Sequence, residues 1–222
     1  MIDSVVGRSN SVFDLVVLGS ALVGFGGVAA AQTFTYAAED GGNTDSSLSQ
    51  FAANTTWGNY FTVEPGFGTI SAIQVAFAQD FAAAGRSLEL LVYDDLNDDG
   101  DPTDALLVSR TTAAAVLTPD GEPTEYAIDT VDVSGGFFVA INMDAQQGES
   151  VFRQDFFEPG DSSWTFYSPV GTPQLDLAAN LFIGNNIDFG TGTWVVRAVG
   201  VPGPGALSAL AIAGVAFGRR RR

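Results

Sequence analysis

The sequence predicts an all-β protein in which residues 32–200 fold as a single β-sandwich or jelly-roll domain. Apolar and polar side chains alternate with a period of two over many short runs, as they do in half-buried strands. The runs are rich in Val, Ile, Phe, Tyr and Thr, and clusters of Gly, Pro, Asp and Asn separate them at the spacing of a sandwich. The segment of about 169 residues is long enough for one good core.

About ten runs predict strands. In chain order they are Thr33–Ala37, Tyr60–Val63, Ile73–Phe77, Leu88–Tyr93, Leu106–Thr111, Glu125–Val133, Phe137–Asn142, Val151–Phe156, Trp164–Tyr167, Ala179–Ile183 and Trp194–Val199. We expect Glu39–Ser49 to be a mobile linker or long loop, so residues 32–58 are partly loop. Ala78–Ala84 and Ala113–Ala115 are the weakly helical pieces. Aromatic residues in strands usually lie in the core, which we expect of Phe77, Phe137, Trp164 and Trp194.

The composition excludes several classes of function. The chain has no Cys, His or Lys, which removes disulfides, thiol nucleophiles, the usual zinc ligands and the Ser-His-Asp mechanism. Residues 32–200 hold 24 of the 26 acidic residues and four of the nine arginines, a net charge of about −20. A surface this acidic repels phosphate backbones and attracts divalent cations, so we expect no nucleic-acid partner. Carboxylate chemistry remains the main enzymatic route.

The N-terminal segment, residues 1–31, is typical of a signal peptide. An apolar run covers Leu15–Ala31, and the small residues Ala29 and Ala31 stand at the −3 and −1 positions that signal peptidase prefers. The predicted cleavage therefore follows Ala31. Arg8 is the only cationic residue before the apolar run, so an uncleaved anchor is the alternative.

Residues 201–222 combine a Pro/Gly spacer, an apolar segment and a cationic end. The apolar segment, Ala206–Phe217, has twelve residues and one polar side chain, Ser208. As a helix it would span roughly 18 Å, short of the ~30 Å hydrocarbon core, which favours transient membrane association and processing over a permanent transmembrane helix. Arg219–Arg222 should stay on the cytoplasmic side. The alternative is a C-terminal amphipathic or core helix.

This three-part arrangement resembles the PEP-CTERM sorting signal of bacterial surface proteins. Val201, Pro202 and Pro204 match its Val-Pro-Glu-Pro box, and Gly203 stands where Glu is usual. The cationic end is made of Arg219, Arg220, Arg221 and Arg222. The resemblance covers residues 201–222 only. It implies an exosortase-type sorting enzyme as a partner, and export to the cell surface, outer envelope or extracellular matrix.

One loop carries residues suited to a metal ion. From Asp95 to Gly100 the chain matches D-x-N-x-D-G, the first half of a calcium loop, in which hard oxygen ligands alternate before a glycine turn. Leu106 occupies position 12, where an EF-hand has a bidentate Glu, and no predicted helices flank the loop, which argues against an EF-hand. A looser calcium loop remains, with Asp95, Asn97, Asp99, Asp101 and Asp104 as candidate donors. The alternatives are a solvated turn, for which the same residues are favoured, and a catalytic role.

Two classes of function follow. The favoured one is a non-enzymatic, exported surface or matrix protein for adhesion, matrix assembly or binding of an extracellular polysaccharide, with calcium as a candidate cofactor. A purely structural envelope protein would look the same in sequence. The alternative is a carbohydrate-active enzyme with a carboxylate pair, for which the acids from Asp155 to Asp176 around Trp164 and Tyr167 are candidates. A core Trp164 beside polar turns is the competing interpretation of that segment.

Overall fold

The computed structural model of the chain describes residues 32–40, 44–48, 55–78, 84–118, 121–143, 149–158, 160–168, 175–189 and 192–203. All of them belong to one compact unit, residues 31–222. The predicted signal peptide, with Ala29 and Ala31, lies outside the described residues. So do Pro204, the apolar segment 206–217 and Arg219–Arg222. Among the described residues, no helix is both long enough and apolar enough to cross a membrane.

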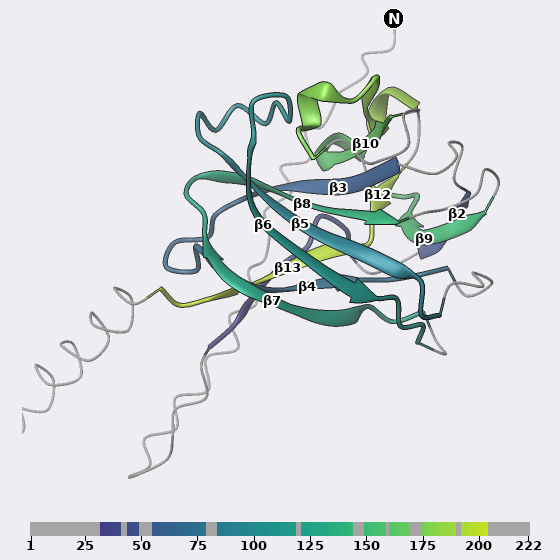
Figure 1. Cartoon of the computed structure of the whole chain (residues 1–222), viewed down its shortest axis with the longest axis horizontal. Coiled ribbons are helices and arrows are strands. Elements are labelled where there is room, and N and C mark those ends of the chain that lie inside the picture. Colours follow the sequence, from purple (N-terminus) through teal and green to yellow (C-terminus); the bar gives the residue numbers. More distant parts are fainter. Residues whose placement is uncertain are drawn as a thin grey trace, which may run out of the picture. The chain divides into compact units, whose positions relative to one another are not determined.

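The described residues form three antiparallel sheets (Figure 1). One has the order β1 (Phe34–Tyr36), β13 (Val196–Val201), β4 (Thr69–Val75), β7 (Thr124–Asp132). The second has the order β11 (Phe182–Asn185), β10 (Ser163–Tyr167), β3 (Thr55–Thr62), β8 (Gly136–Met143), β5 (Ser87–Asp95), β6 (Leu106–Ala114). The third has the order β12 (Thr193–Trp194), β9 (Ser150–Asp155), β2 (Thr44–Leu48). Three short 3-10 turns are η1 (Gly160–Ser162), η2 (Leu177–Ala179) and η3 (Asn186–Phe189). The predicted all-β sandwich is confirmed.

The six-stranded sheet is buried on both faces at its centre, where both alternating sets of side chains of β8 are mostly apolar. Strand β8 is buried at every position. Its residues Phe137, Val139 and Ile141 face the main core, which also takes side chains from β4 and β13 of the four-stranded sheet. Phe138 and Ala140 point the other way. There they join a second cluster, whose other buried members are Leu91, Tyr93, Phe166 and Leu177.

The structure corrects several of the sequence-based expectations. Within the expected linker Glu39–Ser49, residues Thr44–Leu48 form β2, which pairs with β9. Ala113 and Ala114 end β6 instead of starting a helix. The strand expected over Ala179–Ile183 begins only at Phe182, because Leu177–Ala179 forms the 3-10 turn η2. Phe77, Phe137 and Trp194 are buried as expected, whereas Trp164 is only half-buried.

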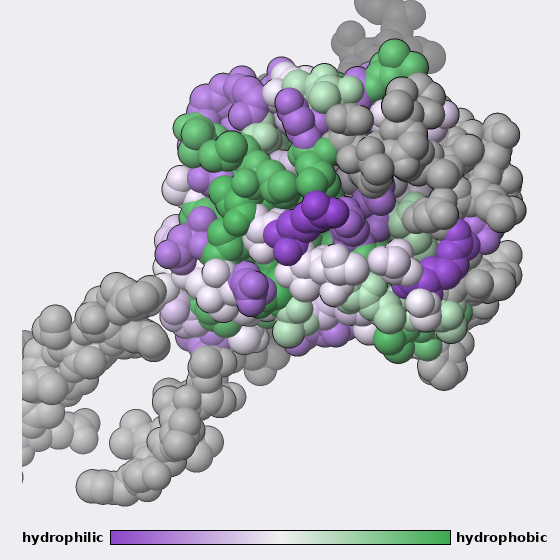
Figure 2. Space-filling view, viewed as in Figure 1, coloured by the Kyte–Doolittle hydropathy of each residue, from purple (hydrophilic) through white to green (hydrophobic). Residues whose placement is uncertain are grey.

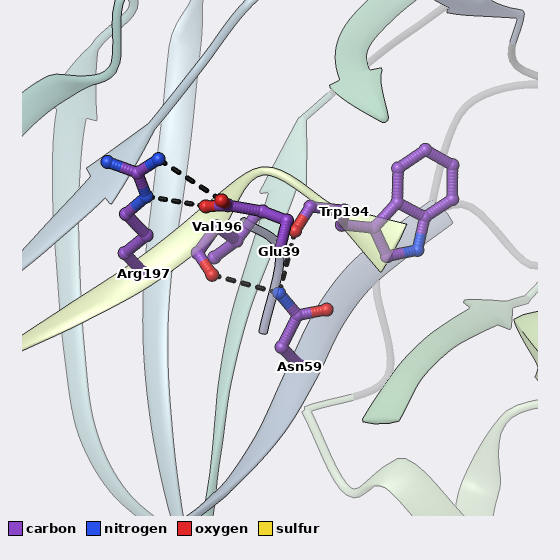
Figure 3. Close-up of polar contacts among 5 residues, drawn as sticks. All are labelled: Glu39, Asn59, Trp194, Val196 and Arg197. Atoms are coloured by element: carbon purple, nitrogen blue, oxygen red, sulfur yellow. Dashed lines mark hydrogen bonds and ion pairs between the residues drawn. The ribbon is translucent and has the colours of Figure 1, made fainter. Parts of the chain in front are cut away.

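The chain changes sheets at Val195, and a buried polar network holds this point. Trp194 pairs with Gln154 of β9, and two residues later Val196 pairs with Val75 of β4. The Asn59 side chain, fully buried on β3, donates from Nδ2 to the carbonyl oxygens of Trp194 (2.8 Å) and Val196 (2.9 Å) (Figure 3). One buried amide therefore ties the six-stranded sheet to both segments flanking the crossover.

An ion pair attaches the segment after β1 to the last strand. The guanidinium of Arg197, on β13, donates from Nε to Glu39 Oε1 and from Nη2 to Glu39 Oε2 at 3.2 Å (Figure 3). The Glu39 side chain is completely buried, and that of Arg197 is 24% exposed. Because Glu39 begins the stretch expected to be a mobile linker, this contact corrects that expectation at its first residue.

Tyr93 gives a prediction about alkaline pH. Its hydroxyl is buried and has no hydrogen-bond partner among the residues that the structure describes. Burial, and then the negative charges of Glu89 and Asp176, raise the pKa of Tyr93. A proton held more tightly in the folded state stabilises below the unfolded-state pKa near 10, and this stabilisation is lost as the pH rises beyond it. We therefore expect Tyr93→Phe to reduce the alkaline loss of unfolding free energy, measured by urea denaturation between pH 7 and 11.

At pH 7 the same Tyr93→Phe variant should be as stable as the parent or more stable, because an unpaired buried hydroxyl is unfavourable by about 1–3 kcal/mol. Tyr126→Phe is the matched control. The Tyr126 hydroxyl accepts a hydrogen bond from the Val116 amide at 2.9 Å, so its removal should lower stability at pH 7. Equal losses in both variants at pH 7 would contradict the prediction.

Candidate functional site

The candidate site lies in residues 96–105, which connect β5 to β6. Strand β5 ends at Asp95, whose carboxylate Oδ2 accepts a hydrogen bond from the Gly100 amide at 2.9 Å. The loop turns back because Asp98 and Gly100 adopt left-handed backbone conformations, with φ of 59° and 75°. Glycine adopts this conformation without strain, and Asp tolerates it better than most residues. The loop thus folds over the end of β5.

Asp94 of β5, and Asp98 and Asp101 of the loop, accept hydrogen bonds from backbone amides. Asp94 Oδ1 accepts from the Ser134 amide at 2.9 Å, and Asp98 Oδ1 accepts from the Gly136 amide. Ser134 lies in the turn between β7 and β8, and Gly136 is the first residue of β8. Asp101 Oδ1 accepts from the amide (2.8 Å) and the hydroxyl (2.7 Å) of Thr103, and these hydrogen bonds lower the pKa of Asp101. These three acids therefore hold the backbone of the loop and of its neighbouring turn.

The other three carboxylates converge, although Asp95 and Asp99 each also accept a backbone amide, from Gly100 at 2.9 Å and from Asp101 at 2.8 Å. One oxygen each from Asp95, Asp99 and Asp104 lie within 4.8 Å of one another. The Asn97 amide nitrogen bridges two of them, donating to Asp99 Oδ2 at 3.1 Å and Asp104 Oδ2 at 2.7 Å. Asp99 and Asp104 are exposed, whereas Asp95 is fully buried. We name Asp95, Asp99 and Asp104 the acidic cluster.

Asp95 is the unusual member of the acidic cluster. Its Oδ1 is buried and accepts no hydrogen bond from the residues that the structure describes, although buried carboxylates are normally paired or hydrogen-bonded. The Tyr60 hydroxyl lies within hydrogen-bonding reach of the Asp95 carboxylate. Burial, and then the negative charges of Asp95 and Asp98, raise the pKa of Tyr60. Arg86, Arg110 and Arg197 form their ion pairs with Glu149, Glu89 and Glu39, all outside the loop.

Four of the five predicted metal donors thus come together. Asp95, Asp99 and Asp104 form the cluster, Asn97 bridges it, and Asp101 is turned to Thr103 instead. Sequence reasoning missed the roles of Asp94, Asp98 and Tyr60, because their partners lie about 40 residues away in the chain. One signal in the sequence points to these contacts. Gly135 and Gly136 are adjacent and have no side chains, so side chains from another part of the chain can lie directly against their backbone. A Cβ at Gly135 would lie 1.8 Å from Asp98 Oδ1.

The residues predicted to bind a sugar, in the segment from Asp155 to Asp176, make contacts within the domain instead. The Asp176 carboxylate caps the turn η2 by accepting from the Ala178 amide at 3.0 Å. The Asp161 carbonyl accepts from Asn185 Nδ2 at 2.6 Å. The Trp164 ring lies parallel to that of Phe166, with ring centres 6.4 Å apart. Asp155 is fully buried, and its Oδ1 accepts from the Phe157 amide at 3.0 Å.

Of the sorting residues, the structure describes the first two, Val201 and Pro202. Val201 is the last residue of β13 and pairs with Thr69 of β4. Pro202 and Gly203 follow, and the Gly203 amide donates to the carbonyl of Gly66 at 3.2 Å. The start of the Pro/Gly box therefore packs on the domain.

Figure 2 shows hydrophobic and hydrophilic residues side by side on the face seen in Figure 1. Leu96 and Leu106, next to the acidic cluster in sequence, are exposed by 70% and 56%.

No protein-family model matches the chain, and no curated protein matches it either.

Proposed function

We propose that this chain is a non-enzymatic bacterial protein exported to the cell surface or extracellular matrix, where its β-sandwich acts in adhesion, matrix assembly or polysaccharide binding. The observation that carries the proposal is the pairing of β1 with β13, in which Phe34 stands opposite Gly200. The chain enters the domain at β1 and leaves it at β13, on neighbouring antiparallel strands. This arrangement is compatible with a cleavable segment before β1 and a sorting segment after β13, since neither segment lies between paired strands.

The Arg197–Glu39 ion pair supports the same proposal. It joins β13 to the residues just after β1, so the two ends of the domain are held together. Cleavage after Ala31 would leave two residues, Gln32 and Thr33, before β1 begins at Phe34. Processing at either end would therefore leave every described strand intact. In this proposal signal peptidase and an exosortase-type enzyme are the processing partners, and both apolar ends contact the membrane only transiently.

The non-enzymatic part of the proposal is supported by the origin of the acidic cluster. A glycosidase places its two carboxylates on either side of the scissile bond. Asp95, Asp99 and Asp104 instead come from one loop and its preceding strand end, with Asn97 bridging the outer two. This arrangement suits a cation between the carboxylates better than a sugar.

The export part predicts both ends of the mature protein. We expect surface fractions of the producing bacterium to contain a chain that starts at Gln32 and lacks Arg219–Arg222, as measured by intact-mass and peptide mass spectrometry. A variant with Arg219–Arg222 replaced by alanine is expected to remain in the membrane fraction with its C-terminus uncut. An intact C-terminus on the surface protein, or a chain found only in the cytoplasm, would overturn the export proposal.

A glycan array incubated with the full chain addresses the ligand. Binding of the protein to an arrayed glycan, without release of sugar from it, would support polysaccharide binding. Release of reducing sugar from any arrayed glycan would overturn the non-enzymatic part of the proposal in favour of a carbohydrate-active enzyme.

A further inference from the structure

We propose that the acidic cluster binds one calcium ion, with Asp95, Asp99 and Asp104 as carboxylate ligands and Asn97 as the fourth protein ligand. The site lies where the loop 96–105 folds over the end of β5. It is independent of the export proposal, because calcium binding to the purified chain and processing of its ends can fail separately.

The buried Asp95 carboxylate is the principal argument. A carboxylate removed from water and left with a free oxygen is strongly unfavourable unless a cation or hydrogen-bond donor pairs with it. Oδ2 of Asp95 has the Gly100 amide, but Oδ1 has no hydrogen-bond partner among the described residues. The neighbouring Tyr60 hydroxyl carries no charge to balance the carboxylate, and Asp99 and Asp104 are acids that add repulsion. A divalent cation bound among the three carboxylates would pair with Asp95 Oδ1 and would also offset the repulsion between the acids.

The spacing of the carboxylates fits calcium. Calcium–oxygen distances are about 2.3–2.6 Å, so two ligands of one ion lie at most about 5 Å apart. The cluster oxygens lie within 4.8 Å of one another, which is inside that limit. Calcium also accepts six to eight oxygen ligands in flexible geometry, so water can complete a set supplied by two exposed acids.

Asn97 indicates how the site would change on binding. Its Nδ2 now donates to Asp99 and Asp104 and so places a partial positive charge between two carboxylates. Rotation of the amide would present the carbonyl oxygen Oδ1 to the ion instead of the nitrogen. The chemistry of the set, carboxylate and amide oxygen without imidazole or thiolate, favours a hard cation over zinc or copper.

Binding would join two parts of the chain that are distant in sequence. Asp94 and Asp98, next in sequence to Asp95 and Asp99, accept hydrogen bonds from the amides of Ser134 and Gly136, in the turn after β7 and at the start of β8. An ion that fixes the loop therefore also fixes that turn. We expect an affinity in the range of extracellular calcium modules, with a Kd of about 10⁻⁴–10⁻³ M, because two of the three carboxylates are exposed.

The test uses the full chain in mild detergent with calcium chloride or magnesium chloride alone. Isothermal titration is expected to give one calcium per chain, and the thermal midpoint should rise with calcium concentration by mass action. Magnesium should bind at least ~10-fold more weakly, because it demands near-ideal octahedral geometry. No heat of binding and no shift of the midpoint would overturn the proposal.

Variants separate a metal site from a merely acidic loop. Asp95→Asn should lower calcium affinity by ~100-fold or more, since even the loss of a group that only orients a ligand lowers affinity 10–100-fold. In chelator Asp95→Asn should be at least as stable as the parent, because it removes a buried charge. In calcium the order should reverse.

Asp101→Asn is the matched control, an acid in the same loop whose carboxylate is turned to Thr103. It should keep the affinity of the parent. The double variant Asp99→Asn/Asp104→Asn changes only exposed side chains, so it tests the site even if Asp95→Asn folds poorly, and it should lose binding. Parent-like affinity in that double variant, or a loss in Asp101→Asn as large as in Asp95→Asn, would contradict the proposal.

Discussion

Replacing Arg197 with methionine is expected to lower the free energy of unfolding by about 3–5 kcal/mol, the loss typical of removing one partner from a buried ion pair. The Glu39 carboxylate is completely buried and would lose the guanidinium that now donates to both of its oxygens. Methionine keeps much of the aliphatic stem of Arg197, so packing changes little. Urea denaturation of the full chain measures the effect.

Glu39→Gln should be milder than Arg197→Met, because the guanidinium is 24% exposed and can turn to water. The double variant Glu39→Gln/Arg197→Met should recover part of the loss, since it leaves no unpaired buried charge. Arg110→Met is the matched control: its pair with Glu89 is more exposed, with 49% of the Arg110 side chain accessible. That change should lower stability by less than about 1 kcal/mol. Similar losses in Arg197→Met and Arg110→Met would refute the argument.

Replacing Asn59 with leucine is expected to destabilise the domain by more than about 3 kcal/mol. Leucine has nearly the same shape but leaves the carbonyl oxygens of Trp194 and Val196 without the donor Nδ2. The Ser163 hydroxyl, which donates to Asn59 Oδ1 at 2.5 Å, also loses its acceptor. Each unsatisfied buried group is unfavourable by about 1–3 kcal/mol. Chemical denaturation should show a lower midpoint.

A double-mutant cycle tests whether Asn59 acts through this network. Ser163→Ala removes the hydroxyl that links Asn59 to the Trp194 amide, so its effect should not add to that of Asn59→Leu. Gln74→Leu is the control, since Gln74 Nε2 makes an exposed hydrogen bond to Glu125 at 2.9 Å. It should change stability by less than about 1 kcal/mol. Full additivity in the cycle would mean that Asn59 stabilises the domain by some other route.

The crossover at Val195 gives these two variants a common consequence. Both interactions hold the start of β13. Asn59, on the six-stranded sheet, binds the carbonyl of Val196, and Glu39, which follows β1, binds the guanidinium of Arg197. Both losses should therefore loosen β13, on which the export proposal depends. Hydrogen exchange of the β13 amides would detect this loosening before global unfolding.

Most strands could be predicted because their pattern is local. Alternation places Leu88, Leu90 and Val92 on one face whatever the rest of the chain does, and the structure puts all three in the main core. Strand β2 could not be found in this way, because Thr44–Leu48 is polar and gains its conformation from pairing with β9, more than 100 residues away. The burial of Trp164 was misjudged for a related reason: alternation gives a side chain's direction, but the elements packed over that face decide how far it is buried.

The sequence by itself determined the all-β class, the acidity of the body and the loop in which the acids gather, since each depends on composition or on near neighbours. Only the tertiary structure decided what each acid does. It assigned Asp94 and Asp98 to a turn some 40 residues away, Asp101 to Thr103, and Asp95, Asp99 and Asp104 to one cluster. It also buried Asp95, Asn59 and Glu39. Burial and long-range pairing depend on which strands become neighbours, and spacing along the chain carries no record of that.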